Sequence, residues 1–307
     1  MIDTVTLFVD KQREYNNKSL RKINNLKTFL NNTTGQIVES GKLNNLRTKK
    51  TDHGILVTGS LPVYYYGNNL QTLTLFQTKE ILYGISEILG FNLREAKVFR
   101  MDIGYNLMMN ELVAKYLTCI GDLSYFKKSV FNDFQTVRLW TSLKSLLFYN
   151  KTLEMQNKKI PLPVEFENCN NKILRYELQF KRRLKNEFGF IDSITCDHLF
   201  NRDFMNKALS KWKKNYFAIR KINSPLQNID FSKGNKYLIK SLASVGLNVL
   251  GYDEIMGMIQ SEKNNLERMA FSRLKKSVRE LLNVSETENA HNYISELDEK
   301  INSVSIE

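Results

Sequence analysis

Apolar and polar positions alternate over three short segments of this chain, and the alternation predicts three β-strands. The segments span residues 100–106, 146–151 and 174–181. Because successive side chains of a strand point to opposite faces, each segment is expected to collect its functional groups on one face. Those groups are Arg100, Asp102 and Asn106; Tyr149 and Lys151; and Arg175, Glu177 and Gln179. Two carboxylates, a tyrosine and several cations are therefore expected to meet on one sheet surface.

That set of groups matches the needs of phosphodiester cleavage, which uses carboxylates to hold a divalent metal, a nucleophile, and cations to balance phosphate charge. Taken singly, each group has an ordinary structural explanation. Asp102 and Glu177 each stand two positions from an arginine, which is the spacing of an ion pair on a strand face. Tyr149 follows an apolar run, as core tyrosines do. Only the three segments together favour a catalytic site.

The N-terminal part carries further patterns. Residues 1–9 predict an edge strand, since they hold Asp3 and lack the basic start of a signal peptide. Residues 19–31 place apolar side chains at helical spacing and predict a helix. Residues 54–63 alternate as a strand, with Pro62 marking its end.

The sequence after this strand is aromatic and then rich in asparagine: Tyr64, Tyr65, Tyr66, Gly67, Asn68 and Asn69. A loop of this composition would present aromatic rings on which nucleic-acid bases stack. The same residues would equally form the aromatic side of a sheet. The pattern leaves both interpretations open.

Downstream, Thr78 is expected to cap a helix whose apolar stripe ends at Gly90, and a second helix is expected over 111–120. Residues 137–140 and 143–150 predict a hairpin. The predicted order β-α-β-α-β-β-β indicates an α+β fold, with a mostly antiparallel sheet and helices packed on one face. The other face would be free to hold a site.

Past Lys185 the pattern becomes helical. The first helix is marked by an apolar stripe at Met205, Leu209, Trp212 and Tyr216, and three more are predicted over 236–244, 252–260 and 266–282. A three-helix unit ending in a basic helix resembles a helix-turn-helix DNA reader in outline, and a helical cap with a solvated charged face is the alternative. The predicted domains are a catalytic domain over 1–185 and a helical C-terminal domain over 186–307, with an acidic tail from 285.

The 307 residues have the composition of a globular protein, with 42% hydrophobic and 25% charged side chains. No apolar run approaches the roughly 18 residues of a membrane span, so we expect an intracellular protein without membrane contact. Cys119, Cys169 and Cys196 lie far apart and are expected to be free thiols. Histidine occurs three times without any zinc-type spacing, which leaves a hard ion held by oxygen as the expected metal.

Charge points to the kind of partner. The net charge is +13 and the pI is near 9.4. Acidic residues dominate from Ser285 onward, so the rest of the chain is more basic than the total indicates. A strongly basic body favours nucleic acid as partner. A lysine- and asparagine-rich proteome would raise the pI in the same way and is the alternative.

The three segments, in chain order, contain the motifs Arg-x-Asp from Arg100, Tyr-Asn-Lys-x-x-Glu from Tyr149, and Arg-x-Glu-Leu-x-x-Lys from Arg175. This series resembles the ordered motifs of rolling-circle replication initiators. It is similar to those of the phage and plasmid initiators of the filamentous-phage gene II/X class, and the Rep_trans plasmid initiators share the three motifs. The stretch Gly59-Ser60-Leu61-Pro62 followed by Tyr66-Gly67-Asn68-Asn69 also resembles the first group. The resemblance spans about residues 57–184.

The resemblance implies a role for each matched residue. Tyr149 stands at the position of the nucleophilic tyrosine, and Asp102 and Glu177 stand at acidic positions associated with a bound Mg²⁺ or Mn²⁺. HUH endonucleases hold their metal with a His-hydrophobic-His pair, which this chain lacks, so the implied fold is HUH-like with a carboxylate metal site. Lys151 is expected to stabilise the phenolate or the phosphate oxygens. Residues expected to contact DNA are Arg100, Arg175, Lys181, Arg182, Arg183, Tyr66, Asn68 and Asn69.

The implied function is metal-dependent, site-specific nicking and joining of a DNA strand at an origin, through a 5′-phosphotyrosine intermediate. The sequence has no P-loop, so unwinding and synthesis would need a separate helicase and polymerase. The expected partner is origin DNA, as single strand or supercoiled duplex, in the cytoplasm of a bacterial host cell. Two alternatives stay open: a mobilisation relaxase with the same chemistry, and a non-catalytic DNA-binding replication regulator.

Overall fold

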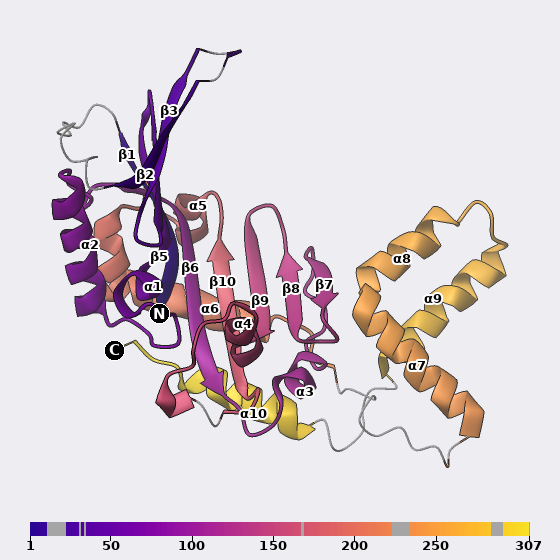
Figure 1. Ribbon diagram of the computed structural model, residues 1–307. Coiled ribbons are helices and arrows are strands. Elements are labelled where there is room, and N and C mark those ends of the chain that lie inside the picture. Colours follow the sequence, from indigo (N-terminus) through magenta and orange to yellow (C-terminus); the bar gives the residue numbers. More distant parts are fainter. Residues whose placement is uncertain are drawn as a thin grey trace.

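The computed structural model describes residues 1–10, 23–30, 32–33, 35–166, 169–222, 232, 234–283 and 291–306. The fold is α+β, with a ten-stranded antiparallel sheet in the N-terminal part and a mostly helical C-terminal region (Figure 1). The expected fold class is confirmed at this level. The strand order is β2-β3-β4-β5-β1-β6-β10-β9-β8-β7.

The elements have the following bounds. The strands are β1 (Ile2–Asp10), β2 (Asn24–Leu30), β3 (Ile37–Leu43), β4 (Leu46–Thr51), β5 (Gly54–Ser60), β6 (Lys97–Met108), β7 (Lys127–Phe131), β8 (Thr136–Trp140), β9 (Lys144–Asn150) and β10 (Ile173–Phe180). The helices are α1 (Leu61–Tyr66), α2 (Leu75–Leu89), α3 (Val113–Leu117), α4 (Lys151–Asn157), α5 (Leu184–Phe188), α6 (Arg202–Phe217), α7 (Gly234–Leu250), α8 (Tyr252–Ser261), α9 (Arg268–Asn283) and α10 (His291–Ser303). Short 3₁₀ helices cover Val164–Phe166 and Cys196–Phe200.

The strand β1 lies inside the sheet, between β5 and β6, and the edge position predicted for residues 1–9 is wrong. Val5, Leu7 and Val9 are buried on one of its faces. Alternating burial of this kind suits a central strand and an edge strand equally. The pattern therefore identified the strand but not its neighbours.

Residues 24–30 form the outermost strand β2, and the helix predicted over 19–31 is wrong. Residues 19–22 and 31 lie outside the described part of the chain. Every side chain of β2 is exposed, so the apolar residues at helical spacing have no surface against which a helix could pack. Pairing with the backbone of β3 decides the conformation instead.

The strand β5 ends at Ser60, earlier than the predicted end at Pro62. Ser60 accepts a hydrogen bond from the backbone N–H of Val63 and so caps α1. Pro62 lies in the first helical turn, where its missing N–H costs nothing. Tyr64, Tyr65 and Tyr66 are therefore helical, which excludes the sheet interpretation, and Gly67, Asn68 and Asn69 form the turn after this helix.

Other predicted elements needed smaller corrections. The N-cap of α2 is Thr74 and not Thr78, because Thr74 forms a capping box with Gln77. Gly90 ends this helix as predicted. The helix α3 is shorter than the predicted span 111–120, and no side chain caps its start. The hairpin of β8 and β9 is confirmed.

The main core packs helices against one face of the sheet. The ring of Tyr176 on β10 stacks on Phe148 of β9, with centroids 4.3 Å apart, and lies 4.5 Å from Trp212 of α6. The Tyr176 hydroxyl donates to the Trp212 carbonyl at 3.1 Å. Because Tyr149 and Arg175 alternate with these residues, their side chains lie on the sheet face that is turned away from α6.

The C-terminal helices contribute to two packing regions. Both α6 and α10 bury side chains in the core of the sheet, so this core includes residues on either side of 185. The predicted triplet of helices is present as α7, α8 and α9, and α7 packs on β7 (Figure 1). The predicted boundary at 185 stays a prediction. In the described ranges, no helix is long and apolar enough to cross a membrane.

Candidate active site on β6, β9 and β10

The three strands predicted to carry the site are neighbours in the order β6, β10, β9. Arg175 of β10 stands opposite Asn106 on one side and Tyr149 on the other. Glu177, two residues further along β10, stands opposite Gly104. Strand pairing thus brings together groups that are far apart in the sequence.

The guanidinium of Arg175 is the centre of the site, and this residue is only 2% exposed. Its Nε donates to Oε1 of Glu177 at 2.6 Å, and its Nη2 donates to Oδ2 of Asp3 at 2.6 Å. Its Nη1 donates to the Asn69 carbonyl and to Oδ1 of Asn106, both at 3.1 Å. Burial alone would lower the pKa of Arg175, but the facing acidic groups raise it above the ordinary value. Arg175 is therefore a fixed, permanently charged anchor.

Gly104 provides the space in which this guanidinium lies. A Cβ atom at position 104 would come within 2.6 Å of Nη2 and 3.0 Å of Cζ of Arg175. Any side chain there would push Arg175 out of its hydrogen bonds. The sequence pattern missed Gly104 because a residue without a side chain contributes nothing to a count of polar groups.

The hydroxyl of Tyr149 donates a hydrogen bond of 3.0 Å to Oε1 of Glu177. Burial, and then the charge of Glu177, raise the pKa of Tyr149 well above its ordinary value, although Arg175 acts in the opposite direction. The hydroxyl is therefore protonated at rest, and nucleophilic attack requires removal of its proton. The hydrogen-bonded carboxylate of Glu177 is in position to accept that proton.

Asp102 lies on β6 in a bidentate pair with Arg100. The guanidinium donates from Nε to Oδ1 at 2.9 Å and from Nη2 to Oδ2 at 2.6 Å. Burial raises the pKa of Asp102 to about 7, even though Arg100 acts to lower it. The ion-pair spacing seen in the sequence thus corresponds to a real pair at this position.

Lys151 is the first residue of α4, so the prediction that it continues strand β9 is wrong. The side chain of Asn150 accepts a hydrogen bond from the backbone N–H of Leu153, which caps the helix and ends the strand. Strand alternation therefore does not determine where Lys151 points. A cap at Asn150 is visible in the sequence only if the helix is already known.

The ammonium of Lys151 nevertheless lies near Tyr149, with Nζ 6.0 Å from the ring centroid. It donates to Oδ1 of Asn69 and to Oε2 of Glu154, both at 2.6 Å. Lys151 is 2% exposed, and burial lowers its pKa, although Glu154 raises it. Asn69 thus links the lysine to the arginine cluster through its side chain and its carbonyl.

Asp3 of β1 belongs to the site, and the sequence reasoning did not identify it as a site residue. Its carboxylate accepts hydrogen bonds from Arg175, from Nδ2 of Asn69 at 3.0 Å and from the hydroxyl of Ser60. Burial would raise the pKa of Asp3, but Arg175 and these hydrogen bonds hold it below the ordinary value. The signal in the sequence was an aspartate near the start of a strand whose alternate residues Val5, Leu7 and Val9 are apolar, which indicates a partnered buried charge.

The remaining residues predicted to bind DNA lie outside this network. Tyr66 packs edge-on against Tyr65, with ring centroids 4.7 Å apart. Asn68 accepts a hydrogen bond from the Leu70 backbone N–H at 3.0 Å and shapes the turn that carries Asn69. Three basic residues follow the end of β10: Lys181, Arg182 and Arg183.

The carboxylates proposed as metal ligands do not fit an ion in the observed arrangement. Both oxygens of Asp102 accept from Arg100, and the oxygens of Glu177 accept from Arg175, Tyr149 and Gln179. An ion would have to displace the Arg100 guanidinium to reach Asp102, and the Gln179 amide or the Arg175 guanidinium to reach Glu177. Among the described residues, no three or more His, Cys, Asp or Glu side chains are grouped so that they could hold a metal.

Tyr149 lines a cavity of about 410 Å³ that opens between β8, β9 and α4. Leu147, Asn150, Leu153 and Glu154 line the same cavity. The buried hydroxyl network thus has an open space next to it, on the side away from the main core.

The sequence matches no protein-family model, and no curated protein matches it. The function of the site therefore has to be inferred from its geometry and from the motifs.

Proposed function

We propose that this protein nicks and rejoins one DNA strand at a replication origin, and so initiates rolling-circle replication, with Tyr149 as the nucleophile. The observation that carries the proposal is the hydrogen bond of 3.0 Å from the Tyr149 hydroxyl to Glu177, beside the cavity that Tyr149 lines. A tyrosine with a raised pKa needs a base, and here the base is already hydrogen-bonded to it.

The reaction is a transesterification. The Tyr149 oxygen forms a bond to phosphorus, the bond from phosphorus to the 3′ oxygen breaks, and the phenolic proton passes to Glu177. The leaving oxygen takes a proton from solvent and becomes a 3′-hydroxyl, which primes synthesis. The 5′-phosphotyrosine bond retains the energy of the phosphodiester, so the reverse reaction rejoins the strand.

The cations have separate roles in this proposal. Arg175 holds Glu177 in place through the bond of 2.6 Å to the oxygen that also accepts from Tyr149. Lys151 lies beside the Tyr149 ring and supplies positive charge near the attacked phosphate. Both are fixed by buried hydrogen bonds, so little reorganisation is needed during the reaction.

The motifs also support the proposal. The Arg-x-Asp, Tyr-Asn-Lys and Arg-x-Glu motifs lie on three adjacent strands of an antiparallel sheet, or directly after one of them. This agrees with the resemblance to rolling-circle initiators and with an HUH-like sheet that lacks the histidine pair. Origin DNA, a separate helicase and a polymerase are the partners that this function requires.

The direct test is to incubate the protein with labelled single-stranded origin DNA and to map any peptide that becomes covalently attached. We expect one adduct, on Tyr149. An adduct on another tyrosine would overturn the assignment of the nucleophile, and nicking without an adduct would overturn the transesterification.

The same assay decides the role of metal. It is run once in EDTA and once with Mn²⁺. Cleavage in EDTA would show that Arg100, Arg175 and Lys151 balance the phosphate charge without a metal ion. Cleavage only with Mn²⁺ would mean that the ion displaces the present hydrogen-bond partners of Asp102 or Glu177, as the expected carboxylate site requires.

One observation favours a second candidate, a non-catalytic DNA-binding replication regulator. Arg175, Asp3 and Glu177 form a buried network in which the arginine joins both carboxylates, and such a network also stabilises sheets that carry no activity. Origin binding without any nicking or adduct, with or without Mn²⁺, would establish this candidate.

A further inference from the structure

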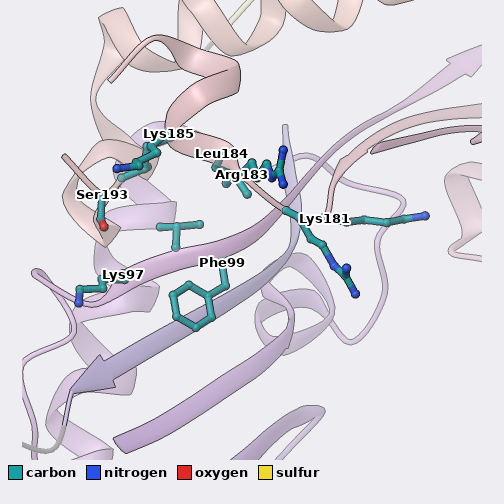
Figure 2. Close-up of a pocket in the computed structure, with 10 residues that line it drawn as sticks. Lys97, Phe99, Lys181, Arg183, Leu184, Lys185 and Ser193 are labelled. Carbon is teal, nitrogen blue, oxygen red and sulfur yellow. The ribbon is translucent and has the colours of Figure 1, made fainter. Parts of the chain in front are cut away.

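A basic surface lies at the end of β10, the strand whose middle part carries Arg175 and Glu177. It is a pocket of about 330 Å³ between β6 and α5, which we call the β6–α5 pocket. Its lining includes five cations and one aromatic ring: Lys97, Lys181, Arg182, Arg183, Lys185 and Phe99. Figure 2 shows Phe99 on the β6 side of the pocket, between Lys97 and Lys181.

The cations of this pocket are largely without acidic partners. Among the described residues, the side chains of Lys181, Arg182 and Arg183 form no ion pair and no hydrogen bond. Lys97 pairs only loosely with Asp10, at 3.9 Å. Lys185 donates to a backbone carbonyl at 3.3 Å. Uncompensated cations around one concavity attract a polyanion such as a phosphate backbone.

Phe99 adds a flat apolar surface to this charge. Its side chain is 46% exposed, and its ring is stacked on Phe8 with centroids 5.1 Å apart and an interplanar angle of 16°. The register of β1 against β6 shifts between Thr6 and Leu7, so Phe99 has no direct partner across the strands. Such a bulge re-aims a side chain. The ring is therefore held by Phe8 on one side and has substantial exposed area.

The pocket lies beyond the end of β10, the strand that carries Arg175 and Glu177. Lys181 follows Arg175 by six residues on the line of β10, a separation of about 20 Å at about 3.3 Å per residue. Burial lowers the pKa of Lys181, and the nearby charges of Arg138 and Arg100 lower it further. Lys181 thus carries positive charge between the Arg100–Asp102 pair and the other cations of the pocket.

We propose that the β6–α5 pocket binds the single-stranded DNA that flanks the nick, with its cations on the phosphates and Phe99 stacked on one base. The proposal rests on the proposed function and names the form of DNA that this site holds. A single strand is required because a ring can stack on the face of a base only when that base has left the duplex. About six stacked nucleotides at about 3.4 Å span the distance from Arg175 to Lys181, and fewer suffice if the bases are splayed.

The test measures binding and not cleavage. Fluorescence anisotropy in EDTA follows labelled oligothymidylates of about 4 to about 16 nucleotides binding to the full chain. The variant Lys181→Ala/Arg183→Ala should reduce the slope of log affinity against log salt by about 1.4, because each lost contact to a single strand removes about 0.7. The matched control, Lys214→Ala/Lys240→Ala, removes two exposed lysines of α6 and α7 and should leave the slope unchanged.

Stacking is tested separately. Phe99→Leu keeps an apolar side chain but removes the ring, and we expect binding to weaken roughly 5- to 100-fold. An abasic oligonucleotide has phosphates but no bases, so Phe99→Leu should not change its binding. The control Phe76→Leu, at an exposed ring on α2, should leave binding of both probes unchanged.

The outcomes separate this proposal from the proposed function. Unchanged binding and salt slope in the pocket variants would overturn the pocket assignment, whatever the nicking assay shows. A fully base-paired duplex that binds as tightly as the single strand and depends equally on Phe99 would overturn the single-strand assignment. Loss of binding in the pocket variants, combined with absence of any adduct in the wild type, would support the pocket and overturn only the nicking function.

Discussion

At the scale of single residues, the site depends on one buried arginine. Arg175 contacts Glu177 of its own strand, and one carboxylate and two asparagines from three other parts of the chain. A buried charge of this kind is tolerated only with all its partners in place. The positions around it are therefore the ones at which small substitutions should have large effects.

Tyr149→Phe removes only the hydroxyl that donates to Glu177. We expect nicking and the covalent adduct to disappear, since no oxygen remains to attack phosphorus. The free energy of unfolding should fall by only about 1 kcal/mol, the net contribution of one hydrogen bond. Adduct formation is measured on gels and stability by urea unfolding. A Phe variant that still forms an adduct would show that another tyrosine reacts.

Gly104→Ala places a methyl group against the Arg175 guanidinium, within 2.6 Å of Nη2. We expect a loss of about 1–3 kcal/mol in the free energy of unfolding and a strong loss of nicking, because Arg175 can no longer hold Glu177. The control is Gly84→Ala in α2, where nothing lies within 4 Å of the added Cβ. That variant should gain about 0.5–1 kcal/mol and keep its activity. If Gly104→Ala and Gly84→Ala had the same stability and the same nicking activity, the close approach of position 104 to the Arg175 guanidinium would be contradicted.

At the scale of elements, helix caps and strand ends decided where functional groups lie. The cap at Asn150 turns the chain from β9 into α4, so that Lys151 approaches Tyr149 from a helix. Ser60 does the same between β5 and α1, and also donates to Asp3. Each cap thus brings a helix to the edge of the site.

The strand β7 contains a half-buried cation that makes stability depend on pH. Lys128 donates to the Ile120 carbonyl at 2.8 Å, and burial lowers its pKa from 10.5 to about 8, although Asp122 raises it. Between these two values the unfolded chain binds more protons than the folded chain, so stability should rise with pH in that window and stay constant below it. The expected rise is up to about 3 kcal/mol, at about 1.4 kcal/mol per pH unit.

The measurement is urea unfolding at several pH values from about 7 to about 10.5. Lys128→Met should remove this component of the slope, and Lys236→Met, at an exposed lysine of α7, should retain it. If the free energy of unfolding changed with pH in the same way in the wild type and in Lys128→Met, the lowered pKa of Lys128 would be contradicted.

At the scale of the whole molecule, the acidic C-terminal segment is part of the core. In α10, Leu297 and Ile301 are almost completely buried. Glu296 accepts from the hydroxyl of Tyr116, and Asp298 accepts from the hydroxyl of Tyr216 at 2.5 Å. The segment predicted as an acidic tail therefore joins α3 and α6, which are distant in the sequence.

Removal of residues 285–307 should thus destabilise the sheet, by more than about 3 kcal/mol from the two buried apolar side chains alone. Thermal unfolding of the truncated chain measures the effect. Glu299→Gln, in the same helix, provides the control for loss of charge alone. A truncated chain that unfolds at the wild-type temperature would show that α10 does not contribute to the core.

The sequence by itself determined the local features of this protein. Period-two alternation identified β6, β9 and β10, because the alternation of side chains is a property of every strand. Helical spacing likewise identified the apolar stripe of α6, and all four of its residues are buried: Met205, Leu209, Trp212 and Tyr216. Net charge and the three ordered motifs depend on residue type and order alone, and they are the basis on which nucleic-acid binding and phosphodiester chemistry are proposed.

Only the tertiary structure decided which groups share the site. Asp3, Asn69 and Gly104 reach Arg175 from three different elements or turns, and no local pattern encodes contacts over such separations. The central position of β1 and the strand β2 depend on pairing partners that lie elsewhere in the chain. The sequence spacing indicated the pairs Arg100–Asp102 and Arg175–Glu177, but only the fold buries both carboxylates, and buried carboxylates require a compensating charge. Long-range strand pairing and burial thus determined which groups surround Tyr149.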